Sequence, residues 1–300
     1  MVKLALQIFC RKMSVTGSRF LETQGPLLIT ANHPNSFFDA ILIGALFKRP
    51  VHFLARGDAF TKPWHSKMLR MLHMIPIYRL SEGKENLGLN EKAFRRSKEI
   101  LSTGGIVLIF IEGICVNKHE LQPFKKGAAR IASENKALPG FSILPVSLAY
   151  DSFCSFGKII NIILAPPIDA KTLFIYEEEP KNSKHFNTLL FDVIGQNIAI
   201  PHHKAAIAPL QKGLLFIPAA IGMAIHFLPY LLIKKMVRVK TRSTVFYDSV
   251  LFGVLLVVYP FFVLLICAVL YLSGIPVSSA VLLSLSLPIF ARCAVVYKKS

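Results

Sequence analysis

A histidine and an aspartate lie six positions apart in the segment ANHPNSFFDA, and both can take part in proton transfer. His33 follows an apolar run at 27–31, and Pro34 comes directly after it. Because proline biases the preceding residue towards extended conformations, we expect His33 in a turn and not inside a helix. An imidazole there can accept a proton as a general base, and a nearby carboxylate can orient it. We therefore take His33 as the candidate base and Asp39 as its partner.

The sequence offers a simpler explanation for Asp39, which the pair alone does not exclude. Ser36 and Asp39 have the spacing of a capping box, in which an acidic side chain serves only the first turn of a helix. A single histidine is also more often a structural residue than a catalytic one. The assignment of His33 as a base therefore depends on other stretches of the chain.

The second stretch combines Arg56 and Gly57 with Arg79, which follows a short apolar run at 75–78. A guanidinium at the end of a strand can hold a phosphate through two parallel hydrogen bonds. The plainer alternative is an exposed cation at a strand end. Taken alone, this stretch does not decide between the two.

The third stretch ends the apolar run 106–111 with Glu112 and Gly113. Glycine lets a ligand approach the backbone closely, although a strand-terminating turn would also use it. Further on, Lys125 and Lys126 begin a helix-like segment. Basic side chains there oppose the helix dipole, but they suit the binding of an anion.

The fourth stretch places Pro145 inside the apolar run 142–150. Proline has no N–H to donate to a neighbouring strand, so its usual places in a sheet are edge strands and bulges. We therefore expect this run to be an edge strand or to contain a bulge.

In order and spacing, the four stretches resemble the lysophospholipid and glycerolphosphate acyltransferase family over roughly residues 15–165. That family carries an Asn-His followed by an Asp, a Gly with Ile-x-Arg, a Phe-Pro-Glu-Gly block and a Val-Pro-Val-like block. The corresponding segments here are Asn32-His33 with Asp39, Gly57 with Ile77-Tyr78-Arg79, Phe110-Ile111-Glu112-Gly113 and Leu144-Pro145-Val146. One block is weak support, whereas four in the family order are strong support.

The chain departs from the family pattern in two blocks. One residue more than the usual spacing separates His33 from Asp39. In the third block Ile111 replaces the usual proline, and Cys115 stands where an arginine is common. Lys118, Lys125 or Lys126 would then replace that arginine in binding phosphate, while packing is the simplest explanation for Cys115.

The resemblance implies a membrane-bound O-acyltransferase. His33 would take the proton from a hydroxyl of the acceptor, Asp39 would stabilise the imidazolium, and the oxygen would attack the thioester of acyl-CoA or acyl carrier protein. No cofactor or metal is expected. The candidate substrate-binding residues are Asn32, Arg56, Gly57, Arg79, Glu112, Gly113, Lys125, Lys126 and Pro145.

The leading acceptor is 1-acylglycerol 3-phosphate, which belongs to phospholipid synthesis. Glycerol 3-phosphate and a lyso-aminolipid are the alternative acceptors. A catalytically silent lipid-binding membrane protein is the alternative from another class of function.

Composition and charge agree with a membrane partner. Hydrophobic residues make up 53% of the chain, mean hydropathy is +0.51 and the formal net charge is +18. Such a basic excess beside apolar segments favours anionic lipids and phosphorylated substrates. No nucleic-acid-binding motif is visible, so we do not expect nucleic acid as a partner. The five cysteines lack the spacing of a zinc site or a disulfide framework, which indicates a reducing compartment.

Strand-like and helix-like segments alternate up to residue 165, and one more helix-like segment follows, which predicts an α/β fold with a mixed sheet flanked by helices. Expected strands are 27–31, 51–55, 75–78, 106–111, 142–150 and 158–165. Expected helices are 36–47, 62–72, 87–102, 125–135 and 186–199. In such sheets, sites lie where strands end and helices begin, as at His33.

The composition changes near residue 212, so we divide the chain into a catalytic domain, 1–212, and a membrane-associated domain, 213–300. No Asp, Glu, Lys or Arg occurs between 249 and 291, which predicts a two-helix hairpin interrupted at 273–276. Basic residues flank this hairpin on both sides, so the positive-inside rule places its ends in the cytoplasm. The segment 213–233, with two prolines, is then expected to be re-entrant or interfacial. The protein would lie in the inner membrane with its catalytic domain on the cytoplasmic face.

Overall fold

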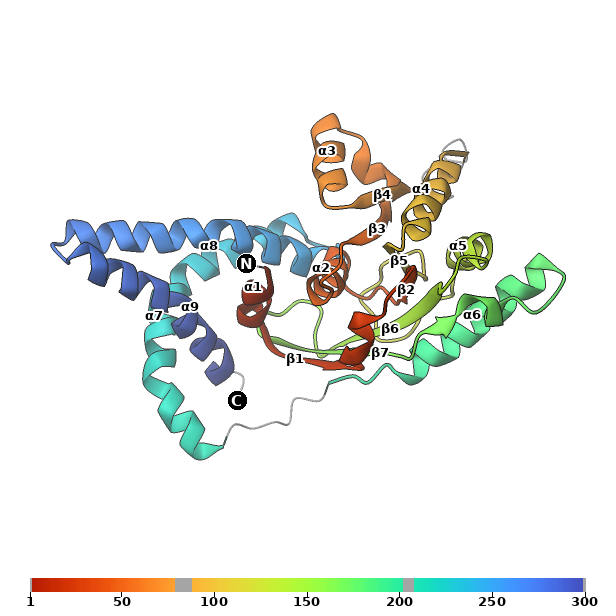
Figure 1. Cartoon of the computed structure of the whole chain (residues 1–300). Coiled ribbons are helices and arrows are strands. Elements are labelled where there is room, and N and C mark those ends of the chain that lie inside the picture. The colour runs from red at the N-terminus through yellow and green to blue at the C-terminus, as the bar shows by residue number, and fades with distance from the viewer. Residues whose placement is uncertain (1, 79–87, 202–207, 299–300) are drawn as a thin grey trace.

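The computed structural model describes residues 2–78, 88–201 and 208–298. Its centre is one eight-stranded sheet of mixed direction with the order β1-β7-β6-β2-β5-β3-β4 (Figure 1). The short strand β8 pairs with β6 outside this order. The strands are β1 Cys10–Thr16, β2 Leu27–Ala31, β3 Val51–Arg56, β4 Met74–Ile77, β5 Ile106–Phe110, β6 Ser142–Tyr150, β7 Lys158–Leu164 and β8 Ile168–Asp169. The strands from β6 through β4 run parallel, whereas β7 is antiparallel to β6.

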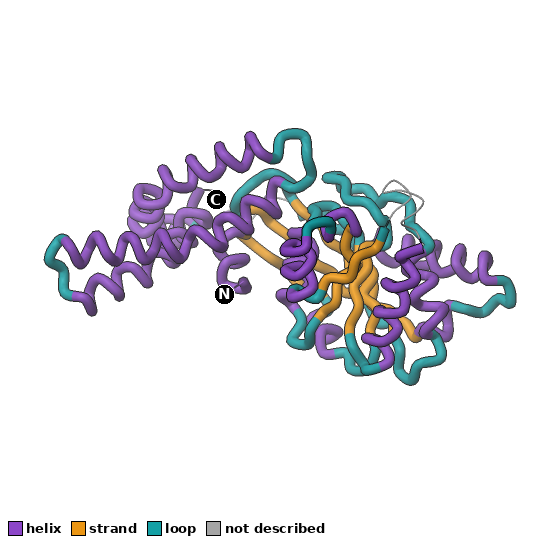
Figure 2. Tube along the Cα trace, turned by 90° about the horizontal axis from the view of Figure 1, so that it is seen from above, coloured by secondary structure: helices purple, strands orange, loops and turns teal. Residues whose placement is uncertain are grey.

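Helices cover both faces of this sheet and extend beyond it. They are α1 Val2–Phe9, α2 Phe37–Leu46, α3 Pro63–Met71, α4 Asn90–Ser102, α5 Gly127–Asn135, α6 Glu179–Gln196, α7 Pro209–Lys240, α8 Tyr247–Leu272 and α9 Val277–Lys298. In Figure 2 the strands fill the centre of one end of the molecule, while the long helices α7, α8 and α9 form the other end. The fold is thus an α/β sheet flanked by helices, as expected.

The two faces of the sheet belong to two separate hydrophobic cores. On one face, α1, α2 and the start of α8 pack against the sheet through side chains such as Phe9, Phe38 and Phe252. On the other face, α4, α5 and α6 supply residues such as Phe186 and Leu190. Strand β2 is buried on both faces, which explains why its sequence is continuously apolar and does not alternate.

The strands and helices expected within residues 1–212 are present, with shifted ends. The largest shift is at α6, which begins at Glu179, before the expected start at Phe186. Helix α1 and strand β1 had not been expected. Strand β1 is a basic edge strand, and it pairs in parallel with β7, so that Cys10 lies opposite Lys158. Its partner is far away in the sequence, so the local pattern carried little signal.

The expectation of an edge strand or a bulge at Pro145 was wrong. Strand β6 is internal, between β7 and β2, and its register with β2 is continuous through Pro145. Pro145 accepts a hydrogen bond from Ala165 N–H, so the side of β6 that lacks a donor faces β7 and β8. Antiparallel pairing with β8 ends at Ile143 and pairing with β7 begins at Val146. The missing N–H therefore falls in the gap between these two partners.

Three helices of the described chain, α7, α8 and α9, are long and apolar enough to cross a membrane. Helices α8 and α9 are joined by a turn at 273–276 (Figure 1). Helix α7 is one helix of 32 residues that contains both Pro218 and Pro229. Arg292 of α9 donates hydrogen bonds to the backbone carbonyls of Gln7, Cys10 and Arg11, so α9 is held against the start of the chain. The division into two domains and the membrane path of α7 stay predictions.

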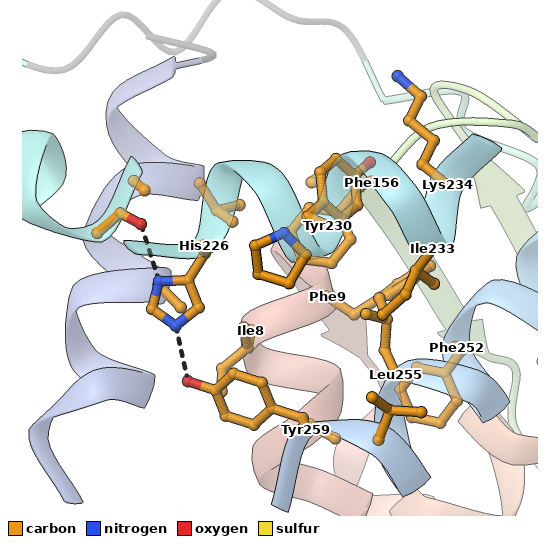
Figure 3. Close-up of a pocket in the computed structure, with 18 of the residues that line it drawn as sticks. Ile8, Phe9, Phe156, His226, Tyr230, Ile233, Lys234, Phe252, Leu255 and Tyr259 are labelled. Atoms are coloured by element: carbon orange, nitrogen blue, oxygen red, sulfur yellow. Dashed lines mark hydrogen bonds between the residues drawn. The ribbon is translucent and has the colours of Figure 1, made fainter. Parts of the chain in front are cut away.

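A cavity of about 720 Å³ lies among α1, α7, α8, α9 and the loop at 154–157 (Figure 3). Its walls are mainly apolar, and they include the rings of Phe9 and Phe252. Inside it, His226 Nδ1 donates to the carbonyl of Gly222, and its Nε2 accepts from the Tyr259 hydroxyl at 3.1 Å. Both ring nitrogens of His226 therefore have hydrogen-bond partners between helices that are otherwise apolar.

Candidate active site

The candidate base lies at the end of a central strand. Strand β2 ends at Ala31, and α2 begins at Phe37, so His33 occupies the connecting loop. The imidazole stacks on the ring of Phe110, the last residue of β5, with ring centroids 3.8 Å apart. Because β2, β5 and β6 are parallel, their ends meet at one edge of the sheet. His33 is therefore at the edge where α/β sheets place their sites.

His33 and Asp39 are in contact in spite of the extra residue between them. His33 Nδ1 lies 2.9 Å from Asp39 Oδ2, and the Asp39 side chain is fully buried. The carboxylate favours the tautomer with the proton on Nδ1, which leaves the lone pair on Nε2. The His33 side chain is 14% exposed. This geometry fits a base that accepts a proton on Nε2.

The capping explanation for Asp39 does not hold. Ser36 is the residue before α2, but its side chain makes no capping hydrogen bond. Its φ is +54°, and this unusual backbone lets the chain fold back around the Asp39 carboxylate. Asp39 Oδ2 accepts from the backbone N–H of Asn35 at 2.8 Å as well as facing His33. The carboxylate therefore organises the catalytic loop, which is the segment 32–36.

Tyr150 is a member of the site that the sequence reasoning missed. Its hydroxyl donates to Asp39 Oδ1, and the residue is completely buried at the end of β6. Burial, together with the charge of Asp39, raises the pKa of the Tyr150 hydroxyl well above its usual value. The phenol therefore stays protonated and remains a donor. A tyrosine at the end of a mainly apolar strand was the available signal, because a buried hydroxyl needs a hydrogen-bond partner.

Glu112 holds the catalytic loop through its backbone. Its Oε2 accepts from His33 N–H at 2.8 Å, and its Oε1 accepts from Gln122 N–H at 2.9 Å. Burial raises the pKa of this carboxyl, although both hydrogen bonds act against the shift. With both oxygens bonded to amides, the geometry favours a positioning role for Glu112 over direct contact with the acceptor.

Asn32 has a similar role. Its amide bonds both the N–H and the C=O of Leu148 in β6, at 2.7 and 2.9 Å, and the side chain is buried. These bonds fix the point at which the chain leaves β2. Asn32 therefore sets the position of the following histidine, and both described hydrogen bonds of its side chain go to Leu148.

Cys115 and Asn117, which follow Glu112 in the chain, also bond to the backbone of the catalytic loop. The sulfur of Cys115 accepts from Ser36 N–H at 3.0 Å, and the amide of Asn117 donates to the carbonyl of Pro34 at 2.7 Å. The segment 112–117 thus holds the catalytic loop by hydrogen bonds to the backbone of His33, Pro34 and Ser36. Packing was the expected role of Cys115, and its location beside a backbone amide agrees with that.

The basic candidates lie at the ends of neighbouring strands. Lys125 packs against Gly113, whose φ of +65° favours glycine and where a Cβ would lie 2.8 Å from Lys125 Cγ. Lys125 and Lys126 are both exposed beside the end of β5. The structure thus brings a cation next to the third block.

The structure describes only part of the second sequence block, which contains Arg56, Gly57 and Arg79. Arg56 is exposed and forms an ion pair with Asp58. Gly57 packs on the ring of Tyr78, where a Cβ would lie 2.3 Å from the ring atoms. Arg79 lies outside the described residues. The substrate-binding roles of these residues and of Pro145 stay predictions.

Among the described residues, no group of three or more His, Cys, Asp and Glu side chains is arranged to hold a metal ion.

Comparison with known proteins gives three findings. A family model described as "Acyltransferase" matches residues 12–149. The 1-acyl-sn-glycerol-3-phosphate acyltransferase of Bacillus subtilis is 26% identical over 118 residues, which is 39% of this chain and 54% of that protein. The chain thus spans about half the length of this relative. The 1-acyl-sn-glycerophosphate (LPA) acyltransferase PlsC from Thermotoga maritima matches 68% of this chain and 79% of its own, with 19% identity and a TM-score of 0.47.

The matched residues contain the His33–Asp39 pair and the ends of strands β2, β3 and β5 that surround it. They also contain all four sequence blocks. Residues 12–149 are therefore similar to the acyltransferase family model, and this similarity includes the candidate site.

Proposed function

We propose that the protein transfers a fatty acyl group from an acyl thioester to the free hydroxyl of 1-acylglycerol 3-phosphate. The observation that carries this proposal is the contact between His33 Nδ1 and a fully buried Asp39 carboxylate. A neutral imidazole held in this way has its Nε2 lone pair available for a hydroxyl proton. No cofactor is needed for this chemistry, and the thioester is a co-substrate.

The reaction follows from that arrangement. Nε2 accepts the hydroxyl proton while the oxygen attacks the thioester carbonyl, and Asp39 stabilises the imidazolium that forms. When the tetrahedral intermediate collapses, the carbon–sulfur bond breaks and His33 returns its proton to the thiolate. Tyr150 and the Asn35 N–H keep the two Asp39 oxygens in place throughout. The ester and a free thiol are the products.

The choice of acceptor rests on the Bacillus relative's name and on the basic residues near the third block. Lys125 and Lys126 are exposed cations that suit a phosphate monoester. Glycerol 3-phosphate and a lyso-aminolipid are alternative acceptors. Acyl-CoA and acyl carrier protein are alternative donors.

The proposed membrane arrangement places the catalytic domain on the cytoplasmic face of the inner membrane. Val237 near the end of α7 and Tyr247 at the start of α8 are buried in the same core as the sheet. If α7 crossed the membrane once, the start of α8 would be separated from that core. We therefore infer that α7 is re-entrant or interfacial and that α8 and α9 form the spanning hairpin, with Lys234, Lys235 and Arg292 near its cytoplasmic ends.

This topology has a direct test. A cysteine introduced at the exposed Arg242, in a chain whose other cysteines are replaced by serine, should react with an impermeant maleimide only after cell lysis. Labelling in intact cells would contradict it.

The function is tested by thiol release from acyl-CoA by the purified full-length protein in lipid nanodiscs, with 1-acylglycerol 3-phosphate, glycerol 3-phosphate and a lyso-aminolipid as acceptors. We expect the first acceptor to give the highest kcat/KM. His33→Ala should lower kcat by about 100- to 10,000-fold. His185→Ala, at a half-buried position of α6 beside the Tyr176 ring, is the matched control and should have the wild-type kcat.

Equal turnover by His33→Ala and the wild type would reject the mechanism. A folded wild type that releases no thiol with any donor and acceptor would favour the silent lipid-binding alternative.

A further inference from the structure

The start of α8 touches the catalytic loop and α2 through two buried hydrogen bonds. Asn35 Nδ2 donates to Asp248 Oδ2 at 2.7 Å, and Phe38 N–H donates to Ser249 Oγ at 3.0 Å. All four residues are buried. More than two hundred positions separate the partners in the chain. A helix of membrane-spanning composition therefore contacts the site directly (Figure 1).

Asn35 connects this contact to the catalytic pair. Its side chain bonds Asp248, and its backbone N–H donates to Asp39 Oδ2. That same oxygen faces His33 Nδ1. A displacement of Asn35 would therefore move a donor away from the atom that orients the base.

A buried cation holds Asp248 in place. Lys158 Nζ pairs with Asp248 Oδ2 and also donates to the carbonyl of Ser152 at 2.9 Å. Both charged side chains are fully buried. The Lys158 ammonium lies 5.6 Å from the ring centroid of Tyr150, the residue that bonds Asp39. Buried ion pairs contribute little net stability, and their best-attested use is to specify one arrangement.

Apolar packing reinforces the same contact. Phe252, on the first turns of α8, lies 5.5 Å from Phe38 and 5.4 Å from Phe9, measured between ring centroids. Farther along α8, residues such as Phe261 and Leu264 are exposed. The first turns of α8 thus belong to the core of the catalytic domain, and the rest of the helix faces outward.

We propose that Asp248 is a positioning residue for catalysis. Through Asn35, it fixes the turn that presents Asp39 to His33, so the C-terminal helices set the geometry of the site in addition to anchoring the protein. The clamp is the set of contacts made by Asp248 and Ser249 to Asn35 and Phe38. This inference rests on the proposed function, because its kinetic consequence is a change in acyl transfer.

The experiment compares two double variants in the full-length protein in nanodiscs. Lys158→Met with Asp248→Asn removes both charges but leaves an amide oxygen that can accept from Asn35. Lys158→Met with Asp248→Leu removes the charges and also the acceptor, and leucine has the same number of side-chain heavy atoms and the same branching as asparagine. The difference between these variants isolates the hydrogen bond to Asn35 from the loss of the ion pair.

We expect the Asn variant, which keeps an acceptor for Asn35, to have a higher kcat than the Leu variant. The Leu variant should lose roughly 10- to 100-fold in kcat, because small misplacements of catalytic groups have effects of that size. KM for acyl-CoA and for 1-acylglycerol 3-phosphate should be unchanged, since no binding contact is removed. Amide hydrogen exchange of the segment 34–39 should be faster in the Leu variant only, while exchange of 106–110 should be equal in both.

Equal kcat and equal exchange in the two variants would overturn the clamp. Faster exchange without a loss of kcat, or a rise in KM in place of that loss, would overturn the positioning role. Ser249→Ala leaves the ion pair intact and removes the acceptor of the Phe38 N–H. If the double variants do not fold, kcat and amide exchange of this single variant test the clamp. If the wild type transfers no acyl group, the proposed function fails, and the exchange comparison still decides whether Asp248 holds the loop.

Discussion

The two faces of the sheet are closed by different parts of the chain. One face is covered by α4, α5 and α6, which lie between residues 90 and 196. The other is covered by α1, α2 and the start of α8, which come from opposite ends of the chain. The polar network around Asp39 lies among the rings of this second face, as Tyr150 and Lys158 indicate. The first face is closed by apolar packing, whereas the second also contains the hydrogen bonds that hold Asp39.

The largest expected effect comes from removing a ring from the second face. Phe252→Ala should lower the free energy of unfolding by about 3–5 kcal/mol, because it leaves a cavity beside Phe9 and Phe38. It should also lower kcat at temperatures at which the variant is folded. Thermal unfolding in a single detergent and acyl transfer measure the two effects.

Two controls sharpen this comparison. Leu190→Ala on the first face should cost about 2–5 kcal/mol of stability but leave kcat unchanged. Phe261→Ala, which is 67% exposed on the outward part of α8, should change stability by less than about 1 kcal/mol. A loss of kcat in Leu190→Ala equal to that in Phe252→Ala would break the distinction between the faces.

A smaller effect is expected from Tyr150→Phe. The change removes one hydrogen bond to a buried carboxylate, which should cost about 1.5–3 kcal/mol of stability. Asp39 would then be held less firmly, so kcat should fall while both KM values stay constant. Steady-state kinetics and thermal unfolding measure this, and Tyr176→Phe on the exposed surface is the control. An unchanged kcat would show that the Tyr150 hydroxyl does not help to orient the pair.

The smallest effect concerns the pH dependence of stability at Glu112, which ties the end of β5 to the catalytic loop. Burial raises the pKa of this carboxyl above its usual value of 4.5, so the folded state binds the proton more tightly than the unfolded chain. Its favourable contribution is therefore complete below pH 4.5 and is lost as the pH rises through the folded pKa.

The test subtracts the Tm of Glu112→Gln from that of the wild type at each pH, because the other titrating groups are common to both. This difference should grow in favour of the wild type as the pH is lowered from 7 towards 4.5. A difference that is independent of pH would contradict the direction of the shift.

Much of the catalytic domain could be predicted because its signals are local. Strand β2 is short and mainly apolar, and Pro34 follows the candidate histidine in the loop after it. The contact between His33 and Asp39 was predicted, but its realisation depends on the positive φ at Ser36, for which a serine gives no signal. The roles of Asn32 and Glu112 could not be read from their types, because an amide or a carboxylate serves a ligand and a backbone N–H equally well.

The sequence by itself determined the alternation of strands and helices, the histidine–aspartate pair, the family resemblance and the apolar C-terminal third. These features depend on hydrophobic periodicity and on short motifs, which act over a few residues. Only the tertiary structure decided which distant groups meet the catalytic pair. Tyr150 reaches Asp39, and Asp248 reaches Asn35, across more than one hundred positions of the chain. A buried hydroxyl or carboxylate must find a partner, but the chain's path through the fold chooses which one.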